Sequence, residues 1–338
     1  MRPTGKSLLL LVTLCAAGSW KNTLAQVAPA SILEIDVENA VQYVKDVSDP
    51  LKFGTDSNVT SANVPKGLWE NVQIADIVAV NGQPAKGTFT ERSQRLSLRP
   101  SPNPGESIAD TNRNGSVSQS FEILTADGSP IGTILLAGLA GGAPPPGAPL
   151  SQTQGNNTIV GGLGAFLGAR GQLGQQVTSQ TIAARQASIT EDPANRRRNG
   201  GGRARFIVHV IPMFQPAVIV TSGGPAIAHS SDFTLVTTSK PAAPGEILSL
   251  YATGLGPTRP GVDPGRPFPS SPLAAVNSPV DVAVNGKSAG VIAAVGYPGS
   301  VDGYQVNFRI PPDTAKGTAT IQVSAAWIAG PAVSIPIQ

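Results

Sequence analysis

The residues with the clearest chemical potential lie in IVGGLGAFLGARGQLG, residues 159–174, where six glycines surround Phe166 and Arg170. Glycine-rich loops cradle phosphates where they open a helix, because their backbone N–H groups then point at the anion. Here Leu167 replaces the third glycine of a dinucleotide motif, no helical pattern follows, and no acidic residue lies about 20 positions further on. Phosphate binding is therefore disfavoured.

Glycine has a second use, because it adopts positive φ and lets two backbone segments approach closely at a sharp turn or a barrel corner. On this interpretation the stretch turns the chain between two strands, and Phe166 plugs a barrel interior. Arg170 then either faces a ligand or pairs with a carboxylate across the barrel. Five glycines would form the turn and the coiling after it: Gly161, Gly162, Gly164, Gly168 and Gly171.

Other catalytic groups are sparse in this sequence. Neither His209 nor His229 has the cysteine or histidine neighbours that a zinc site needs, so we expect no metal and no cofactor. His209 lies within the apolar run FIVHV, which favours a structural histidine. We also disfavour a hydrolase, because we expect no G-x-S-x-G elbow that would mark a nucleophile. With no catalytic residues predicted, an enzyme is the less favoured class.

Basic residues gather at one place, RRRNGGGRAR at 196–205, where five arginines surround a glycine-rich hairpin tip. A solvated tip is the favoured interpretation, and a patch for an anionic partner is the alternative. Without residues 1–25 the chain carries as many basic as acidic side chains and two tryptophans, Trp69 and Trp327. The sequence therefore predicts no nucleic-acid partner and few aromatic platforms for sugars.

The start of the chain predicts where the protein works. Residues 1–25 have the pattern of a secretory signal peptide, with an apolar run after a basic start and Ala25 at the cleavage position. Cys15 would leave with this segment, since Leu14 is too bulky for a lipoprotein processing site. No later apolar run reaches the length of about 20 residues that a spanning helix needs. We expect a secreted, periplasmic or cell-surface protein without membrane insertion.

Alternating apolar residues between turn-forming pairs predict an all-β protein. Residues 26–69 are expected to be an N-terminal extension, in which 31–47 is a strand that enters a short helix. Residues 70–212 hold eight candidate strands, the number that closes into a small antiparallel barrel. The proline-rich segment 138–157 is expected to be either a functional flap or a mobile loop beside it. The candidate strands are 76–80, 87–98, 117–124, 131–138, 157–161, 168–176, 186–191 and 203–211.

A second set of alternating runs covers residues 213–338 and predicts a β-sandwich of immunoglobulin type. The proline-rich connection 256–273 would be a rigid surface loop on this sandwich. Six strands are predicted here: 246–254, 279–286, 289–297, 303–310, 318–327 and 332–338.

The glycine-rich stretch also carries a resemblance to known families. IVGGLGAFLGARG is similar to the VVGGTG-x-F-x-x-ARG signature of plant dirigent proteins, and more loosely to the same turn of allene oxide cyclases. This resemblance covers about residues 70–212 and implies an eight-stranded barrel, a homotrimer and an Arg170 that faces the cavity. The position before Phe166, acidic in several dirigent proteins, is Ala165 here, which argues against proton-transfer chemistry.

The C-terminal part resembles a different family. LYATGLGPTRPG and VDGYQVNFRIP are similar to a C-terminal module of secreted soil-bacterial proteins that is related to immunoglobulin-like IPT/TIG domains. The resemblance covers about residues 213–338 and implies a bacterial exported protein.

These observations favour a non-enzymatic binding protein. The barrel would hold a small, mostly apolar ligand, aromatic compounds included, through Phe166 and Arg170, and the second module would make surface or protein contacts. Two alternatives stay open. One is an isomerase or cyclase that acts in the barrel cavity, and the other is a structural surface or matrix protein whose barrel is filled by side chains.

Overall fold

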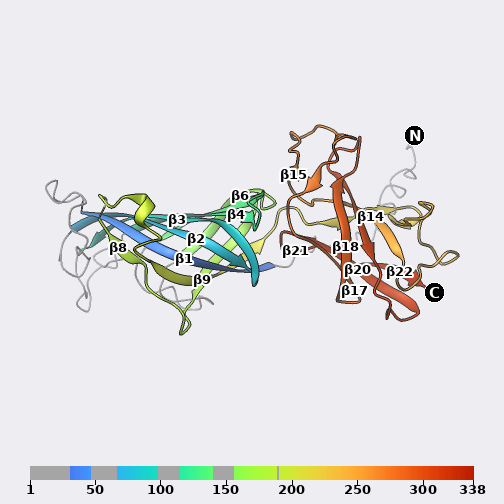
Figure 1. Cartoon of the computed structure of the whole chain (residues 1–338), viewed down its shortest axis with the longest axis horizontal. Helices are drawn as coiled ribbons and strands as arrows, with labels where there is room; N and C mark the ends of the chain where they lie inside the picture. Colours follow the sequence, from blue (N-terminus) through green and yellow to red (C-terminus); the bar gives the residue numbers. More distant parts are fainter. Residues whose placement is uncertain (1–30, 47–66, 98–114, 140–155, 189) are drawn as a thin grey trace, which may run out of the picture.

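The chain, described by a computed structural model, folds almost wholly into β-strands (Figure 1). The structure describes residues 31–46, 67–97, 115–139, 156–188 and 190–338. Among these residues the one helical segment is the 3₁₀ turn Pro193–Asn195. None of the helical structure in the described ranges is long and apolar enough to cross a membrane. The all-β prediction is confirmed.

Eight antiparallel strands close into a barrel, because β1 pairs with β2 on one side and with β9 on the other. A three-residue strand, β8 (Arg185–Ala187), lies outside the closed ring and pairs in parallel with β1. The barrel strands, in order around the ring, are β1 (Ser31–Asp46), β2 (Gly67–Val80), β3 (Gln83–Ser97), β4 (Gly115–Thr125), β5 (Pro130–Leu139), β6 (Asn156–Gly164), β7 (Arg170–Gln176) and β9 (Gly202–Ile211).

Strand β1 differs from its prediction, since it has no helical part. Its pairing with β2 shifts register between Glu38 and Val41, and Asn39 takes a φ of 54°. A β-bulge of this kind inserts one residue, so the inward-facing positions pass from odd numbers such as Val37 to the even-numbered Ala40. The apolar spacing that resembles a helix is a strand alternation with one extra residue.

The number of barrel strands is as predicted, but one member is different. Within 186–191, only the first two residues belong to β8, and Glu191 N donates to the Ser188 carbonyl oxygen (2.9 Å) in a turn. Strand β1, predicted as part of an extension before the barrel, supplies the eighth barrel strand instead. The barrel therefore begins at Ser31, well before residue 70.

The two ends of the barrel have different surroundings. The end with the β2–β3, β4–β5 and β6–β7 turns faces the second sheet and is called the joint end, and the opposite end is called the far end (Figure 1). The predicted flap, 138–157, lies largely outside the described residues.

A cluster of phenylalanines fills the middle of the barrel. The ring centroids of Phe89 and Phe121 lie 4.9 Å apart, and the Phe206 ring lies 4.7 Å from the first and 5.2 Å from the second. Each of these side chains is at most 2% exposed. Aliphatic residues from the surrounding strands complete the same buried cluster towards the joint end, so this part of the interior is a core.

A second, curled sheet of eleven strands follows the barrel. All six predicted strands are present, as β14, β17, β18, β19, β20 and β22. The strands are β10 (Ala217–Val218), β13 (Ile227–His229), β14 (Ile247–Thr253), β15 (Thr258–Arg259), β16 (Ala275–Val276), β17 (Val280–Val284), β18 (Lys287–Gly296), β19 (Gly303–Arg309), β20 (Gly317–Ala325), β21 (Ile328–Ala329) and β22 (Val333–Ile337). Strands β11 (Val220–Thr221) and β12 (Gly224–Pro225) form a separate pair.

The two sheets are joined by the hairpin between β20 and β21. Its tip residues, Ala326 and Trp327, take φ values of 49° and 63°, and Ala326 is fully buried within the barrel core. Trp327 packs against the same core. Asn277 Nδ2 also donates to the Pro130 carbonyl oxygen (3.1 Å) across the joint. The barrel and the second sheet thus share buried surface, which fixes the space between them.

Candidate functional site

The glycine-rich stretch forms the β6–β7 turn at the joint end. Gly164 and Gly168 take positive φ values of 62° and 69°, and Leu167 N donates to the Gly164 carbonyl oxygen (3.2 Å). Phe166 is 1% exposed and packs in the barrel core, as a plug would, and this burial gives no support to its predicted contact with a ligand. The turn lies at residues 164–169, later than the predicted 161–164, because Gly162 is still paired within β6.

The five predicted glycines are not equivalent. A Cβ at Gly162 would overlap the Phe166 carbonyl oxygen, and one at Gly171, where φ is 138°, would overlap the His209 carbonyl oxygen. At Gly161 the nearest atom to such a Cβ is Arg170 Nη1 at 4.0 Å. Close approach of the backbone therefore explains why glycine occupies positions 162 and 171, but it does not explain Gly161.

Arg170 points away from the barrel interior. Ala169 and Leu173 are buried in the core, whereas Arg170 lies between them on the exposed face, as strand alternation requires. Its Nη1 donates to the carbonyl oxygens of Val160 (2.7 Å) and Ala169 (3.0 Å). The predicted ligand contact inside the barrel is wrong, and no carboxylate of the described residues pairs with this side chain, which instead binds the carbonyl oxygens of Val160, the bulge residue of β6, and of Ala169.

Towards the far end the barrel interior becomes polar. Glu91 and Ser93 follow Phe89 on the inward face of β3, and Gln119 precedes Phe121 on that of β4. Gln119 Nε2 donates to Glu91 Oε2 (2.8 Å). Two further hydrogen bonds join polar side chains of this interior. Ser93 Oγ donates to Asn71 Oδ1, and Asn157 Nδ2 donates to Gln119 Oε1 (3.2 Å). These side chains hydrogen-bond to one another, and no motif in the sequence marks them.

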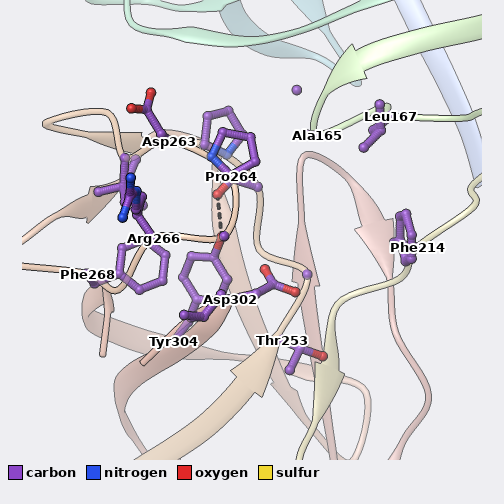
Figure 2. A pocket seen from close by; sticks show the side chains of 18 of the residues that line it. Ala165, Leu167, Phe214, Thr253, Asp263, Pro264, Arg266, Phe268, Asp302 and Tyr304 are labelled. Atoms are coloured by element: carbon purple, nitrogen blue, oxygen red, sulfur yellow. Dashed lines mark hydrogen bonds between the residues drawn. The ribbon is translucent and has the colours of Figure 1, made fainter. Parts of the chain in front are cut away.

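An open cleft of about 360 Å³ lies between the β6–β7 turn and the second sheet (Figure 2). This volume is within the range of about 300–1,000 Å³ that small-molecule sites occupy. Leu167 and Phe214 form one wall, Phe268 and Tyr304 another, and the proline-rich loop 256–273 borders the cleft. The lining is mostly apolar, with a few polar groups among the rings.

Exposure distinguishes the rings of this cleft from those of the barrel core. Phe214 is 58% exposed, and Leu167 and Val301 are each 54% exposed. Phe268 and Tyr304 are held more firmly, since each is at most 7% exposed and their ring centroids lie 5.1 Å apart. The cleft therefore combines a fixed aromatic base with apolar side chains that are open to a ligand.

The polar groups of the cleft centre on Asp302 and Tyr304. The Tyr304 hydroxyl donates to the Gly256 carbonyl oxygen (2.7 Å; Figure 2). Burial raises the pKa of this hydroxyl well above its ordinary value, and the charge of Asp302 raises it further. Burial likewise raises the pKa of Asp302, and the Tyr304 hydroxyl offsets part of that rise. Asp302 is nevertheless exposed as a whole residue, so its carboxylate is shielded on one side and open to the cleft on the other.

Two other hollows are less suited to a ligand. One, of about 520 Å³, lies beside Trp327, and its carboxylate, Asp281, already accepts a hydrogen bond from Ser288 (2.5 Å). The other, of about 390 Å³, is lined by Asp36 and Arg205, which form an ion pair (2.6 Å). In both hollows the named charged or polar groups already satisfy one another within the fold.

The arginine-rich hairpin is engaged with carboxylates of the barrel. Arg196 and Arg197 both bind Asp76, at 2.5 and 2.8 Å. Arg203 pairs with Glu38 (3.2 Å). Arginines that are already paired offer less charge to a partner, so the structure favours neither a bare solvated tip nor an anion-binding patch. The hairpin instead fastens the outside of the barrel.

Residues 286–290, GKSAG, have the spacing of a nucleophile elbow, contrary to the expectation that the sequence contains none. They lie in the β17–β18 hairpin, with no helix after them, and Ser288 Oγ donates to Asp281. His229 is bound elsewhere, with Nδ1 2.5 Å from Glu246 Oε1. Over the described ranges, no group of three or more histidine, cysteine, aspartate or glutamate side chains could hold a metal ion.

Comparison with known proteins gives no family. No protein family matches the chain, and no curated protein matches it. Among solved structures, a polysaccharide lyase aligns with 91% of this chain and 40% of its own, at 8% identity and a TM-score of 0.17. The chain spans less than half of that lyase, and a TM-score this low shows no common fold.

The cleft residues escape prediction because they come from distant parts of the sequence. Leu167 lies in the barrel turn, Phe214 in the connection and Asp302 before β19. One signal is present, since the loop 256–273 is too long and proline-rich for a simple turn. Its expected role is that of a rigid surface loop, whereas in the structure it forms a border of the cleft.

Proposed function

We propose that this protein is an exported, non-enzymatic binding protein that holds a small, mostly apolar ligand in the cleft between its barrel and its second sheet. The observation that carries this proposal is the partly exposed apolar wall of Leu167, Phe214 and Val301 facing a fixed aromatic base. Exposed apolar surface gathered in a hollow is costly in water unless a ligand covers it. The shared core at the joint keeps the cleft formed before binding.

The proposal moves the ligand from the barrel interior to the cleft. Phe89, Phe121 and Phe206 fill the middle of the barrel, which supports a scaffold role for it. An isomerase or cyclase acting in the barrel is the weaker alternative, because Arg170 lies outside and the interior carboxylate of Glu91 is hydrogen-bonded to Gln119.

We further propose a dirigent-like or allene oxide cyclase-like barrel and an immunoglobulin-like, IPT/TIG-related second domain, from about residue 213. The eight-stranded closure and the buried Phe166 in its glycine-rich turn support the first assignment. Short antiparallel strands around one apolar core support the second. A homotrimer through the barrel follows from the same resemblance and belongs to this proposal.

The filled barrel core also favours a second candidate, a structural component of the cell surface or matrix. In this case the barrel and the second sheet would serve assembly, and the cleft would hold no small molecule. The two candidates differ in one measurable property, which is a ligand retained by the protein.

Native mass spectrometry of residues 26–338, purified from the secreting host, tests the first candidate. We expect a retained small-molecule mass that disappears on denaturation. The variant Val301→Trp, at a 54% exposed cleft position, should fill the space and remove that mass. Val160→Trp is the matched control, since this valine is 48% exposed on the outer face of the barrel, and it should keep the mass.

A bare protein mass, even after soaking with phenolics and oxylipins, would overturn the binding proposal and support the structural candidate. A retained mass that survives Val301→Trp would place the ligand outside the cleft. The same spectrum gives the oligomer mass, which tests the trimer separately.

A further inference from the structure

The cleft contains a carboxylate without a cationic partner. Among the residues that the structure describes, no lysine, arginine or histidine nitrogen lies within 4.0 Å of the Asp302 carboxylate, and none contributes to its pKa. The Tyr304 hydroxyl donates to the Gly256 carbonyl oxygen and also lies close enough to the Asp302 carboxylate to offset part of the rise of its pKa. A neutral hydroxyl leaves the negative charge uncompensated, so the carboxylate can still accept hydrogen bonds from a cationic ligand.

The lack of a cationic partner matters because of where the Asp302 carboxylate lies. Most other carboxylates discussed above are paired, as Asp76 is with two arginines and Asp36 with Arg205. Asp302 instead lies in a hollow beside Tyr304, between the side with Phe214 and the side with Phe268 (Figure 2). A negative charge in partly apolar surroundings interacts more strongly with a cation than the same charge in water does.

The other charged side chains of the cleft also leave it with a negative charge. Asp263 and Arg266, from the proline-rich loop, also line it, so its three charged side chains sum to one negative charge. All three residues are exposed, but the side chains of Asp263 and Arg266 lie on the loop side of the cleft, away from Phe214 (Figure 2). A cation is favoured by this balance, and aromatic rings nearby add to that preference.

Resting on the proposed function, we infer that the ligand of the cleft is an organic amine, with its ammonium group bound by Asp302 and its apolar part packed against Leu167, Phe214 and Val301. The ammonium donates hydrogen bonds to the carboxylate, which the fold leaves without a cation. The apolar part covers the side chains that are now exposed. No bond is made or broken, so the protein acts by binding alone.

Three probes of similar size separate charge from shape: 2-phenylethylamine, the neutral 2-phenylethanol and the anionic 3-phenylpropanoate. Titration of residues 26–338 at pH 7, followed by amide chemical shifts, reports affinity and place together. We expect shifts at Gly254 and Gly256, and an amine that binds about tenfold more tightly than the alcohol. The anion should bind most weakly.

The variant Asp302→Asn tests the assigned residue. Asn tolerates the φ of 54° that Asp302 takes, so the backbone is kept while the charge is lost. The amine should then bind no more tightly than the alcohol. Asp313→Asn removes the same charge from an exposed residue that pairs with Lys287 (2.6 Å), outside the cleft, and should keep the tenfold preference.

The outcomes distinguish this inference from the proposed function. Three probes that bind the cleft with equal affinity would overturn the amine and leave the binding function standing. An amine preference that survives Asp302→Asn would overturn the assigned residue. Shifts absent from the cleft with all three probes would overturn the binding function itself, and the inference with it.

Discussion

Aromatic side chains gather both in the barrel interior and in the cleft, and of these two places the cleft leaves room beside its rings. Phe121 packs against two other rings and is fully buried, whereas Phe214 is 58% exposed at the edge of the cleft. The same residue type therefore serves packing in one place and is available for binding in the other. Aromatic content in a barrel sequence does not by itself indicate a ligand cavity.

Truncating one ring at each place gives the largest expected contrast. Phe121→Ala should lower the free energy of unfolding by about 3–5 kcal/mol, because it leaves a cavity in the three-ring cluster. Phe214→Ala should change it by less than about 0.5 kcal/mol, since little buried surface is lost. Urea unfolding of both variants measures the difference. Similar losses would mean that the two places do not differ as described.

A second contrast concerns the glycines of the barrel. Gly171→Ala should destabilise the protein by about 3 kcal/mol, because the new Cβ meets the His209 carbonyl oxygen and φ is 138°. Gly161→Ala is its matched control in the neighbouring strand, where the nearest atom is 4.0 Å away, and should be nearly neutral. Thermal unfolding of the pair checks this, and equal losses would contradict the close approach at residue 171.

The sequence allowed the strand pattern to be predicted but not the cleft. Alternation placed most strands within a few residues, and glycine together with Phe166 located the turn at the joint end. The bulge at Asn39 imitates helical spacing, which explains why the pattern of β1 predicts a helix that is absent. Alternation also decides which face a strand residue lies on, and it places Arg170 outside, between the buried Ala169 and Leu173, whereas the resemblance predicts it inside.

The cleft depends on a different kind of information. It forms where the β20–β21 hairpin tip, with Trp327, enters the barrel end and sets the distance between the two sheets. Nothing in a local pattern predicts this docking, because Ala326 and Trp327 take positive φ without the glycine or asparagine typical of such a turn. Contacts between distant segments are therefore the part that sequence reasoning could not supply.

The hairpin tip gives the third prediction. Trp327→Ala should lower the free energy of unfolding by about 2 kcal/mol, less than a fully buried ring, because the side chain is only partly buried. It should also loosen the cleft, since the tip joins the two sheets. Unfolding followed by the fluorescence of Trp69 measures the first effect. An unchanged stability would show that the joint does not depend on this side chain.

Two carboxylates make the stability of the fold depend on pH in opposite directions. Burial alone would raise the pKa of Asp76, but hydrogen bonds from Arg197, Arg196 and Asn39 outweigh it and lower the pKa from 3.8 to about 2. This pairing stabilises the folded state above about pH 4 and is lost as the pH falls towards 2. The pKa of Asp302 is raised, so its contribution has the opposite sign and is lost as the pH rises through that pKa.

Replacing each carboxylate with an uncharged amide tests these opposite contributions to stability. At pH 7, Asp76→Asn should cost about 1 kcal/mol after allowance for solvent screening, and the difference from the parent protein should vanish near pH 2. Asp302→Asn should be neutral or slightly stabilising at pH 7. Urea unfolding at pH 7, 4 and 2 follows both variants. A loss at pH 7 for Asp302→Asn would mean that this carboxylate is paired within the fold.

The smallest expected effect distinguishes Arg170, which is predicted as a ligand contact by resemblance, from the residues that line the cleft. Arg170→Ala removes hydrogen bonds to the carbonyl oxygens of Val160 and Ala169 on an exposed surface, so it should cost only about 0.5–1 kcal/mol. Its affinity for 2-phenylethylamine should equal that of the parent protein, because the side chain is not among those that line the cleft. Weaker binding by Arg170→Ala would mean that the ligand contacts the outer face of the barrel beside Val160 and not the cleft alone.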